Sequence, residues 1–387
     1  MNDETTNSVA CELLRRRWND LTRELQALKT LLKDAKVPSE LGPYLSKIAT
    51  EADEVWAQLV EIDRDLGRQL PALLDDLRSA LAQAANRVQL LARDLAAPIV
   101  SPCAEDRLVT RVIHWAHASN PLTAAMPAAC CDGDPGVWPF IDFVPLYYMP
   151  RLTRRGLLYL PLLFHEYGHI VYRCRRPEMD ALVAELQQWI SDQLEPRSRR
   201  HDALARSQRI QQRQVVATWY AWAQELFCDA VGLQMAGPCY VHAFSSYLSR
   251  LERGDYSLPR EELVGSSHPV LWLRIRFLGS QARRLGLNVI ADHCERDWET
   301  IANTLGVGED YYGFFEAEWQ TKVEAILSDM LTEADCRLCL QDEVKVQREP
   351  TPEESPIVFL NRAWEIFLSN KQDFADAERR LLSIATP

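Results

Sequence analysis

Two histidines four residues apart, with a glutamate directly after the first, are the residues of this chain best suited to chemistry. They are His165, Glu166 and His169. On a helix, residues four apart lie on one face, about 6 Å apart along the axis, so both imidazoles can reach one metal ion. Zinc accepts imidazole nitrogen at roughly 2.0–2.1 Å, and Glu166 can reach a water molecule beside the metal. This His-Glu-x-x-His spacing is typical of the active-site helix of zinc peptidases.

A catalytic zinc site needs a third protein ligand, and the segment 222–230 offers one. Glu225 and Asp229 lie four residues apart there, so they share a helix face. Glu225 can bind zinc, and Asp229 can accept a hydrogen bond from the outer nitrogen of a ligand histidine, which would fix its ring. The alternative is a pair of acids on a solvated helix face, which the neighbouring Trp222 and Phe227 disfavour.

A third motif follows in the segment 267–275, where His268-Pro269 precedes Arg274-Ile275. His-Glu-x-Gly-His, then Glu-x-x-x-Asp, then His-Pro with an arginine six residues after the histidine, resembles the HtpX and CAAX-prenyl-protease family of gluzincin zinc metallopeptidases. The resemblance covers roughly residues 157–285. Well-known members of that family have transmembrane helices, and no apolar run in this sequence approaches the length of one. Prenylated or membrane substrates are therefore not implied.

The resemblance implies a role for each motif residue. It implies Zn²⁺ as the cofactor, with His165, His169 and Glu225 as its ligands. Glu166 would be the general base, and Asp229 would support a ligand histidine. His268 and Arg274 would stabilise the oxyanion of the transition state.

The function that we expect is a zinc-dependent endopeptidase, which hydrolyses peptide bonds with an activated water and Glu166 as the base. Two alternatives stay open. One is a non-catalytic, zinc-bound scaffold that binds partners through its N-terminal helices, although a scaffold would not need Glu166. The other is a zinc hydrolase that acts on a small amide, which a closed pocket rather than an extended groove beside the metal would favour.

The composition of the chain is that of an ordinary globular protein. The chain has 387 residues, of which 47% are hydrophobic, and a net charge of −12. The negative charge argues against a general nucleic-acid binder. No signal-peptide core follows the acidic N-terminus, so we expect a soluble, cytoplasmic protein, in which the ten cysteines stay reduced. Cys336 and Cys339 form a lone C-x-x-C, which by itself is weak evidence for a metal or redox site.

The N-terminal part carries a heptad pattern, in which apolar residues recur at alternating steps of four and three. The pattern runs through three segments, 14–32, 45–66 and 74–95, and is broken by Pro38, Pro43 and Pro71. Such a seam is typical of helices that pack nearly parallel or antiparallel, as in a hairpin or a three-helix bundle. Pro71 could instead lie inside one kinked helix. We expect this arm to serve homo-oligomerisation or the docking of a partner or protein substrate.

The rest of the chain reads as mainly helical, with at most a small β-sheet. Two short segments, Leu108–His114 and Phe140–Tyr148, have the character of strands, and the prolines around the second favour an edge strand that could pair with an extended peptide. The fold class that we expect is therefore mainly α, with a coiled-coil-like arm over residues 1–97 and a gluzincin-like domain over residues 98–345. A linker and a C-terminal helical hairpin would complete the chain over residues 346–387. Further helices are expected at Met179–Leu194, His201–Met235, Cys239–Leu251, Pro269–Leu285, Ala291–Thr304, Phe314–Leu340, Ile357–Leu368 and Phe374–Leu382.

Overall fold

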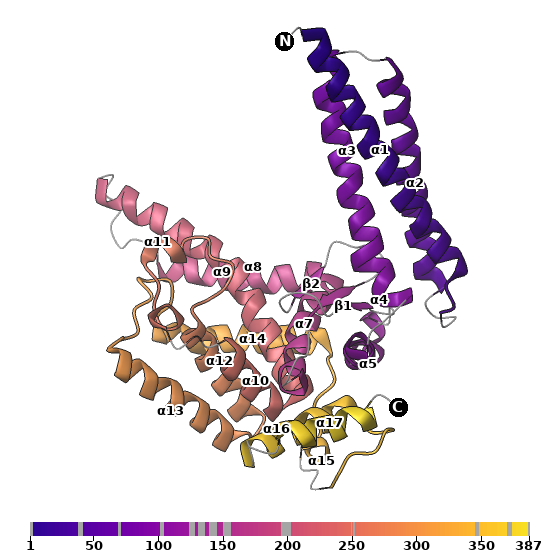
Figure 1. The fold of residues 1–387 in the computed structure, drawn as a ribbon. Coiled ribbons are helices and arrows are strands. Elements are labelled where there is room, and N and C mark those ends of the chain that lie inside the picture. The colour runs from indigo at the N-terminus through magenta and orange to yellow at the C-terminus, as the bar shows by residue number, and fades with distance from the viewer. Residues whose placement is uncertain are drawn as a thin grey trace.

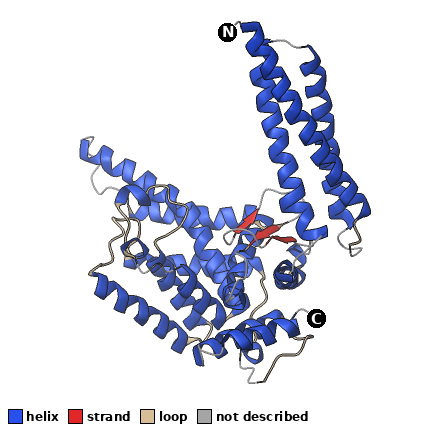
Figure 2. Ribbon diagram, in the orientation of Figure 1, coloured by secondary structure: helices blue, strands red, loops and turns tan. Residues whose placement is uncertain are grey.

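The computed structural model shows a helical arm that projects from a larger helical body (Figure 1). It describes residues 3–37, 42–68, 71–100, 104–123, 128–130, 136–138, 145–149, 156–194, 203–248, 250, 252–344, 348–369 and 374–385. Nearly all of the regular structure in these ranges is helix, and the strands form one small sheet (Figure 2). The expectation of a mainly α fold with at most a small sheet is confirmed.

The arm is a bundle of three long helices that contact one another pairwise. Helix α1 spans Asp3–Asp34 and α2 spans Gly42–Arg68, and after the short turn η2 (Pro71–Leu73) α3 spans Leu74–Gln89. A π-helical stretch, η3 (Leu90–Ala96), continues α3 into α4 (Ala97–Val100). Pro71 therefore lies between two helices rather than inside a kinked one. The heptad positions form the buried core of the bundle: Leu21, Leu25, Leu28, Leu32, Ile48, Val55, Leu59, Ile62, Leu66, Leu77, Leu81, Val88, Leu91 and Leu95.

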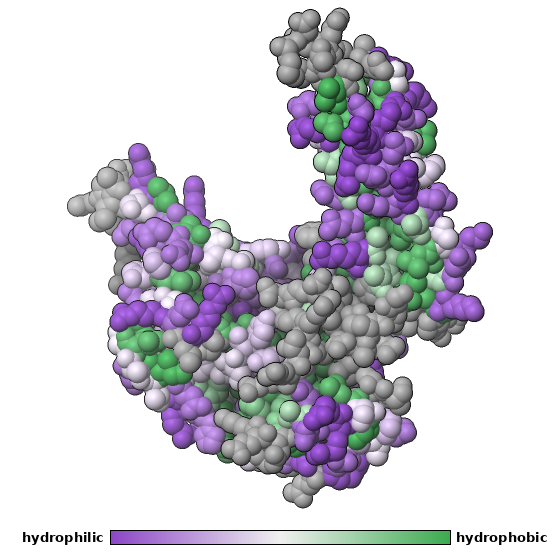
Figure 3. Space-filling view, in the orientation of Figure 1, coloured by the Kyte–Doolittle hydropathy of each residue, from purple (hydrophilic) through white to green (hydrophobic). Residues whose placement is uncertain are grey.

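The outer surface of the arm is largely hydrophilic, with apolar side chains in smaller patches (Figure 3). The sequence pattern explains this, because a heptad seam leaves most helix positions to polar residues. None of the described helices combines the length and the apolar character needed to cross a bilayer.

The sheet has three short strands, β1 (Ala128–Cys130), β2 (Gly136–Trp138) and β3 (Leu146–Tyr148). Their order is β1-β3-β2, with β1 parallel and β2 antiparallel to the central β3. The two faces of β3 pack in different directions, as the period of two in a strand requires. Leu146 and Tyr148 pack against the core of the arm, whereas Tyr147 is buried in the core of the body.

Both strands expected from the sequence need correction. Leu108–His114 lies within helix α5 (Ala104–Ala118), because its apolar residues recur at helical spacing and bury one face. These residues are Val109, Val112, Ile113 and Ala116. Of the segment Phe140–Tyr148, only its last three residues form the described strand β3, and residues 139–144 lie outside the described part of the chain. The segment was expected at an edge, but β3 is the central strand.

The body consists of helices that follow the expected segments closely. The longer ones are α7 (Leu163–Cys174), α8 (Arg176–Gln193), α9 (Ala203–Ala236), α10 (Pro238–Leu248), α12 (Leu271–Arg284), α13 (Asn288–Leu305), α14 (Gln320–Ala334), α16 (Pro356–Ser369) and α17 (Phe374–Ala385). Short turns of helix join them: η4 (Pro121–Thr123), α6 (Gly156–Tyr159), η5 (Leu160–Leu162), η6 (Arg253–Asp255), α11 (Arg260–Leu263), η7 (Ala317–Trp319) and α15 (Gln341–Val344). The helix expected to reach Leu340 ends at Ala334, because Asp335 adopts a left-handed conformation with φ 47°.

The core of the body surrounds the contact between α7 and α9, which is the most extensive between any two described elements. Fully buried aromatic residues of α9, Trp219, Trp222 and Phe227, fill the space beside it. The C-terminal helices α16 and α17 contribute Ile357, Phe359 and further residues to the same core. The most buried part of the body is therefore the part that carries the candidate metal-ligating residues.

Candidate metal site

A glycine allows the two helices of the candidate site to approach closely. Gly168 lies on α7 between the two histidines, and a Cβ atom placed on it would lie 2.8 Å from Cα of Cys228 on α9. That distance is shorter than real Cβ contacts, so a larger residue would push the helices apart. The glycine of the His-Glu-x-Gly-His motif thus sets the distance from α7 to Glu225 and Asp229.

The Glu225 carboxylate lies between the two imidazoles of α7. Its Oε2 atom lies 3.3 Å from Nε2 of His165, and its Oε1 atom lies 3.5 Å from Nε2 of His169. Neighbouring ligands around a tetrahedral zinc ion are separated by about 3.3–3.5 Å, given bonds of about 2.0–2.2 Å. Glu225 is only 6% exposed, and its Oε2 atom makes no well-aligned hydrogen bond among the described residues, although Nε2 of His165 lies 3.3 Å from it. A buried, ionised oxygen that faces an imidazole nitrogen without a close hydrogen bond fits a metal ligand better than a structural acid.

A cysteine of α9 adds a second candidate donor. The ligating atoms of His165, His169 and Cys228 all lie within 4.8 Å of one another, so these residues form a group that could hold a metal ion. Cys228 faces Gly168 and is fully buried. Burial and the nearby Glu225 carboxylate raise the pKa of its thiol well above the usual value, whereas the thiolate is the form that binds metals. The structure therefore places two possible third donors beside the histidine pair.

Asp229 connects four helices through its side chain. Its carboxylate accepts a hydrogen bond from Nδ1 of His165 on α7 at 2.8 Å and one from the Tyr240 hydroxyl on α10 at 3.0 Å. The guanidinium of Arg274 on α12 binds both Asp229 oxygens, each at 2.8 Å. Asp229 is 2% exposed and Arg274 is 5% exposed, so this pair is buried and joined by two hydrogen bonds. The bond to His165 turns Nε2 of that ring toward Glu225, as expected from the sequence.

Burial and neighbouring charges separate the pKa values of the two histidines. For His165, burial lowers the pKa, but the hydrogen bond to Asp229 and the adjacent Glu225 carboxylate outweigh it and raise the pKa to about 10. For His169, burial and the charge of His165 lower the pKa to about 4. Without a bound cation, His165 therefore carries a proton at neutral pH, and that proton partly balances the buried carboxylates.

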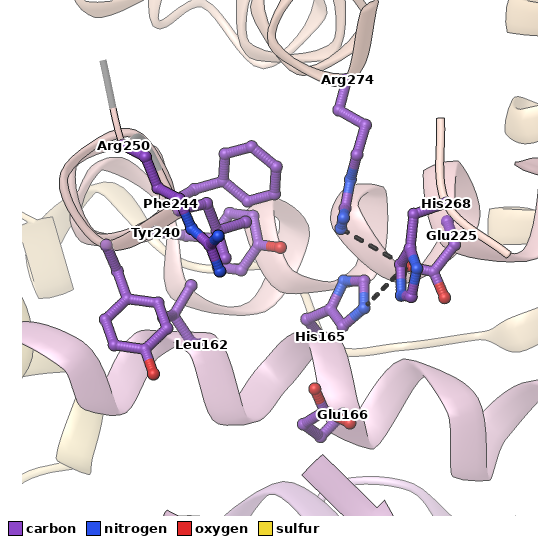
Figure 4. Close-up of a pocket in the computed structure, with 11 residues that line it drawn as sticks. Leu162, His165, Glu166, Glu225, Tyr240, Phe244, Arg250, His268 and Arg274 are labelled. Carbon is purple, nitrogen blue, oxygen red and sulfur yellow. Dashed lines mark ion pairs between the residues drawn. The ribbon is translucent and has the colours of Figure 1, made fainter. Parts of the chain in front are cut away.

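Glu166 lies on the same helix turn but faces a different partner. Its carboxylate accepts a hydrogen bond from the backbone N–H of Val137 in β2, the strand that lies beside α7. Burial is the main cause that raises the pKa of Glu166 above its usual value. The carboxylate also lines the cavity next to His165 (Figure 4). Glu166 is thus separate from the Glu225 and Asp229 cluster and lies beside space that a substrate could enter.

The two residues of the third motif occupy different environments. His268 is in the loop before α12 and its side chain is 59% exposed, with Nε2 lying 3.5 Å from Oε2 of Glu225 and Nδ1 bonded to the Ser267 hydroxyl. Arg274 is buried, bound to Asp229, and also lies 3.5 Å from Oε2 of Glu225. Arg274 therefore has a buried partner, whereas the exposed His268 lies at the edge of the cavity within 3.5 Å of Glu225.

A cavity of about 370 Å³ opens beside these residues, close to the lower end of the range for small-ligand sites. Sequence reasoning anticipated part of its lining but missed the wall that α10 provides. This wall comprises Tyr240, Phe244, Tyr247 and Leu248, and Arg250 follows it. Tyr240 also fits closely against Gly232 of α9, where a Cβ atom would lie 2.3 Å from its ring. An aromatic residue every three or four positions along α10 was the signal that could have revealed this wall.

Because Asp229 bonds to side chains from three other helices, we expect its substitution by asparagine to reduce both stability and metal binding. Changing Asp229→Asn would leave the Arg274 guanidinium buried without its full counter-charge, so we expect the free energy of unfolding to fall by about 3–5 kcal/mol. The loss of support for His165 should weaken zinc binding by about 10–100-fold. Urea unfolding and a chelator competition assay measure the two effects.

Asp292→Asn is the matched control for Asp229→Asn. Asp292 pairs with Arg283 in an exposed position, with side chains 55% and 39% exposed. Its substitution should change stability by no more than about 1 kcal/mol. Equal, small effects of the two substitutions would show that Asp229 does not hold the cluster together.

The raised pKa of His165 predicts that metal binding displaces a proton. His165 must be neutral to bind a metal, and its pKa of about 10 means that it is protonated at neutral pH. His169, with a pKa of about 4, is already neutral there and adds no pH dependence. We therefore expect zinc affinity to rise about tenfold per pH unit between about pH 6 and 8, with release of about one proton. Calorimetry in buffers of different ionisation enthalpy measures this, and an affinity independent of pH would contradict it.

In comparisons with known proteins, the chain matches no protein-family model, no curated protein and no solved structure.

Proposed function

We propose that this protein is a zinc-dependent hydrolase that cleaves peptide bonds. The observation that carries the proposal is the convergence of His165, His169 and Glu225, with the Glu166 carboxylate placed beside them in the same cavity. A site that served only to hold a metal would have no use for a separate, partly buried carboxylate that faces open space. Such a carboxylate is what general-base catalysis requires.

We assign Glu225 rather than Cys228 as the third metal ligand. Glu225 offers one oxygen toward each imidazole at distances typical of ligands that share a metal, and its Oε2 atom makes no well-aligned hydrogen bond among the described residues. Cys228 lies where α7 and α9 are in closest contact, against Gly168, so its thiol already has a packing role. Two histidines and a glutamate also match a known donor set of catalytic zinc, which leaves one position for water or substrate.

The positions of Glu166 and Asp229 indicate what each would do in hydrolysis. Bound zinc supplies Lewis acidity, which polarises a carbonyl group and acidifies water. Glu166 takes the proton of the attacking water and passes it to the leaving amine. Its burial favours proton uptake, because a desolvated carboxylate is a stronger base. The buried Asp229 holds His165 in the orientation that directs Nε2 into the site.

We assign different roles to the two residues of the third motif, His268 and Arg274. His268 is the candidate donor to the developing oxyanion, because its exposed side chain already reaches within 3.5 Å of Glu225 at the edge of the cavity. Arg274, which was expected beside it, donates from Nε and Nη2 to the two oxygens of Asp229. We assign Arg274 chiefly to holding Asp229 in place, with a secondary electrostatic effect on the oxyanion.

The resemblance to HtpX and CAAX-prenyl-protease gluzincins agrees with this assignment, and we propose that the chain is a relative of that family. The order of the motifs supports it, as does the pairing of α7 and α9 through the motif glycine. The projecting arm, with its hydrophilic outer surface, is our candidate for oligomerisation or for docking a protein substrate near the cavity. We further propose that the protein acts in the cytoplasm.

Zinc content separates the two possible third ligands. Glu225→Gln removes the charged donor that lies between the histidines, so we expect a purified, folded variant to lose stoichiometric zinc. Cys228→Ser changes a single atom in the same helix and should keep one zinc ion per chain. Metal analysis after dialysis against a weak chelator distinguishes these outcomes. Zinc loss in Cys228→Ser with zinc retention in Glu225→Gln would reverse the assignment.

Glu166→Gln separates catalysis from metal binding. This change keeps the shape of the side chain but removes the proton acceptor, so we expect zinc content and fold to be unchanged. Base catalysis typically contributes a factor of about 10²–10⁴, and kcat for peptide hydrolysis should fall by that amount. Turnover is measured with peptide pools by labelling the new amino groups.

The matched control for Glu166→Gln is Glu178→Gln, which changes an exposed glutamate near the start of α8. It should leave zinc content and turnover unchanged. If wild-type protein with full zinc content shows no more cleavage than Glu166→Gln across these pools, the peptidase proposal fails. A non-catalytic zinc-bound scaffold or a hydrolase of small amides would then be the better interpretation.

A further inference from the structure

The cavity beside the candidate metal site extends to a second cationic group. Tyr240, Phe244 and Tyr247 follow one another at steps of four and three along α10 and line the cavity; Tyr240 and Phe244 are fully buried, and Tyr247 is partly exposed. Arg250 lies just beyond the end of this helix and also lines the cavity. Figure 4 shows Arg250 on the side of the cavity away from Glu225 and His268.

The two arginines of the cavity differ in how their charges are balanced. Arg274 is buried, bound to both oxygens of Asp229, and stacked on the Phe244 ring with its Cζ atom 4.9 Å from the ring centroid. The Arg250 guanidinium makes no ion pair within the described part of the chain. The neighbouring carboxylate of Asp255 accepts instead from the backbone N–H groups of Arg250 and Glu252. These bonds fix the backbone at Arg250 and leave its charged end available.

A guanidinium in a cavity, such as that of Arg250, is suited to bind carboxylate groups. Arginine presents several N–H donors in a planar fork, which matches the two oxygens of a carboxylate. The chain as a whole carries a net charge of −12, so an acidic ligand gains no general attraction from the protein. A preference for carboxylates would therefore have to come from a local cationic group such as Arg250.

We propose that Arg250 is a specificity-determining residue, which binds a carboxylate of the peptide substrate while the partly exposed Tyr247 packs against the intervening residues. This inference rests on the proposed peptidase function for the identity of the ligand. The carboxylate has two possible sources: the free C-terminus of a short peptide, or the side chain of an aspartate or glutamate within a longer one. Both would bind the guanidinium in the same way.

Binding to four peptide pools tests the inference. The probes are dansyl-labelled hexapeptides of randomised sequence, made with a free or an amidated C-terminus, and each with or without Asp and Glu, so that the label itself adds no carboxylate. Binding is measured by anisotropy on the zinc-loaded, full-length Glu166→Gln protein, so that turnover does not interfere. We expect at least one carboxylate-bearing pool to bind about tenfold more tightly than the amidated, acid-free pool, at the lower end of the range for bonds to charged groups because Arg250 is exposed.

Matched substitutions assign the preference to Arg250. Arg250→Gln, made in the same protein, keeps a polar side chain but loses the charge, and should abolish the tenfold preference. Arg253→Gln removes an exposed arginine three residues further along that does not line the cavity, and should leave the preference intact. Tight binding of acid-free pools with a free C-terminus identifies the terminal carboxylate as the source. Tight binding of amidated pools that contain Asp and Glu identifies the side chain.

Two results would overturn the inference: equal binding of all four pools, or a preference that survives in Arg250→Gln. Turnover of the same pools by the protein with Glu166 intact tests the proposed function separately. Cleavage without any carboxylate preference removes the role of Arg250 and leaves the peptidase. A preference that depends on Arg250, without cleavage, leaves a carboxylate-binding site and removes the peptidase.

Discussion

The buried carboxylate of Asp229 is the group on which the arrangement of the site depends. It binds side chains from α7, α10 and α12 while it belongs to α9, so one residue fixes four helices relative to one another. Burial of such a charge is costly unless every lone pair is used, and here the arginine, the imidazole and the phenol use them. The imidazole of His165 is thereby held in a single orientation before any metal arrives.

The charge of the cluster explains why a cation fits there. Two buried carboxylates, Glu225 and Asp229, face only one buried guanidinium, that of Arg274. The remaining negative charge is balanced either by a proton on His165 or by a divalent cation. A metal ion and the proton on His165 therefore compete for the same negative charge.

Much of this site could be predicted from the sequence, because helical spacing is local information. Residues four apart on one helix face each other in any helix, so the pairs His165 with His169 and Glu225 with Asp229 needed no tertiary structure. The aromatic face of α10 was missed because Tyr240, Phe244 and Tyr247 look like ordinary core residues. Arg250 was missed because an exposed arginine is common, and only the tertiary fold places it in a cavity.

The small sheet shows where local patterns were insufficient. Apolar residues of Leu108–His114 suggested a strand, but their spacing also fits a helix. In the structure the segment is helical, and its apolar face is buried in the core of the body. The central position of β3 could not be read from its sequence, since strand order depends on which segments meet. Similarly, the hydrogen bond from Val137 to Glu166 involves a backbone group, which leaves no trace in the residue types.

The two faces of β3 contact different cores, so this strand of three residues aligns the arm with the body. Leu146 and Tyr148 belong to one core and Tyr147 to the other, where its hydroxyl bonds to the buried His117. A slip of one residue would exchange the two faces, which would place the Tyr147 hydroxyl among the leucines of the arm. Packing against the arm and packing against the body thus both require the same register of β3. Because β2 pairs with β3 and contacts Glu166, the position of the arm and that of the Glu166 carboxylate are set by the same register.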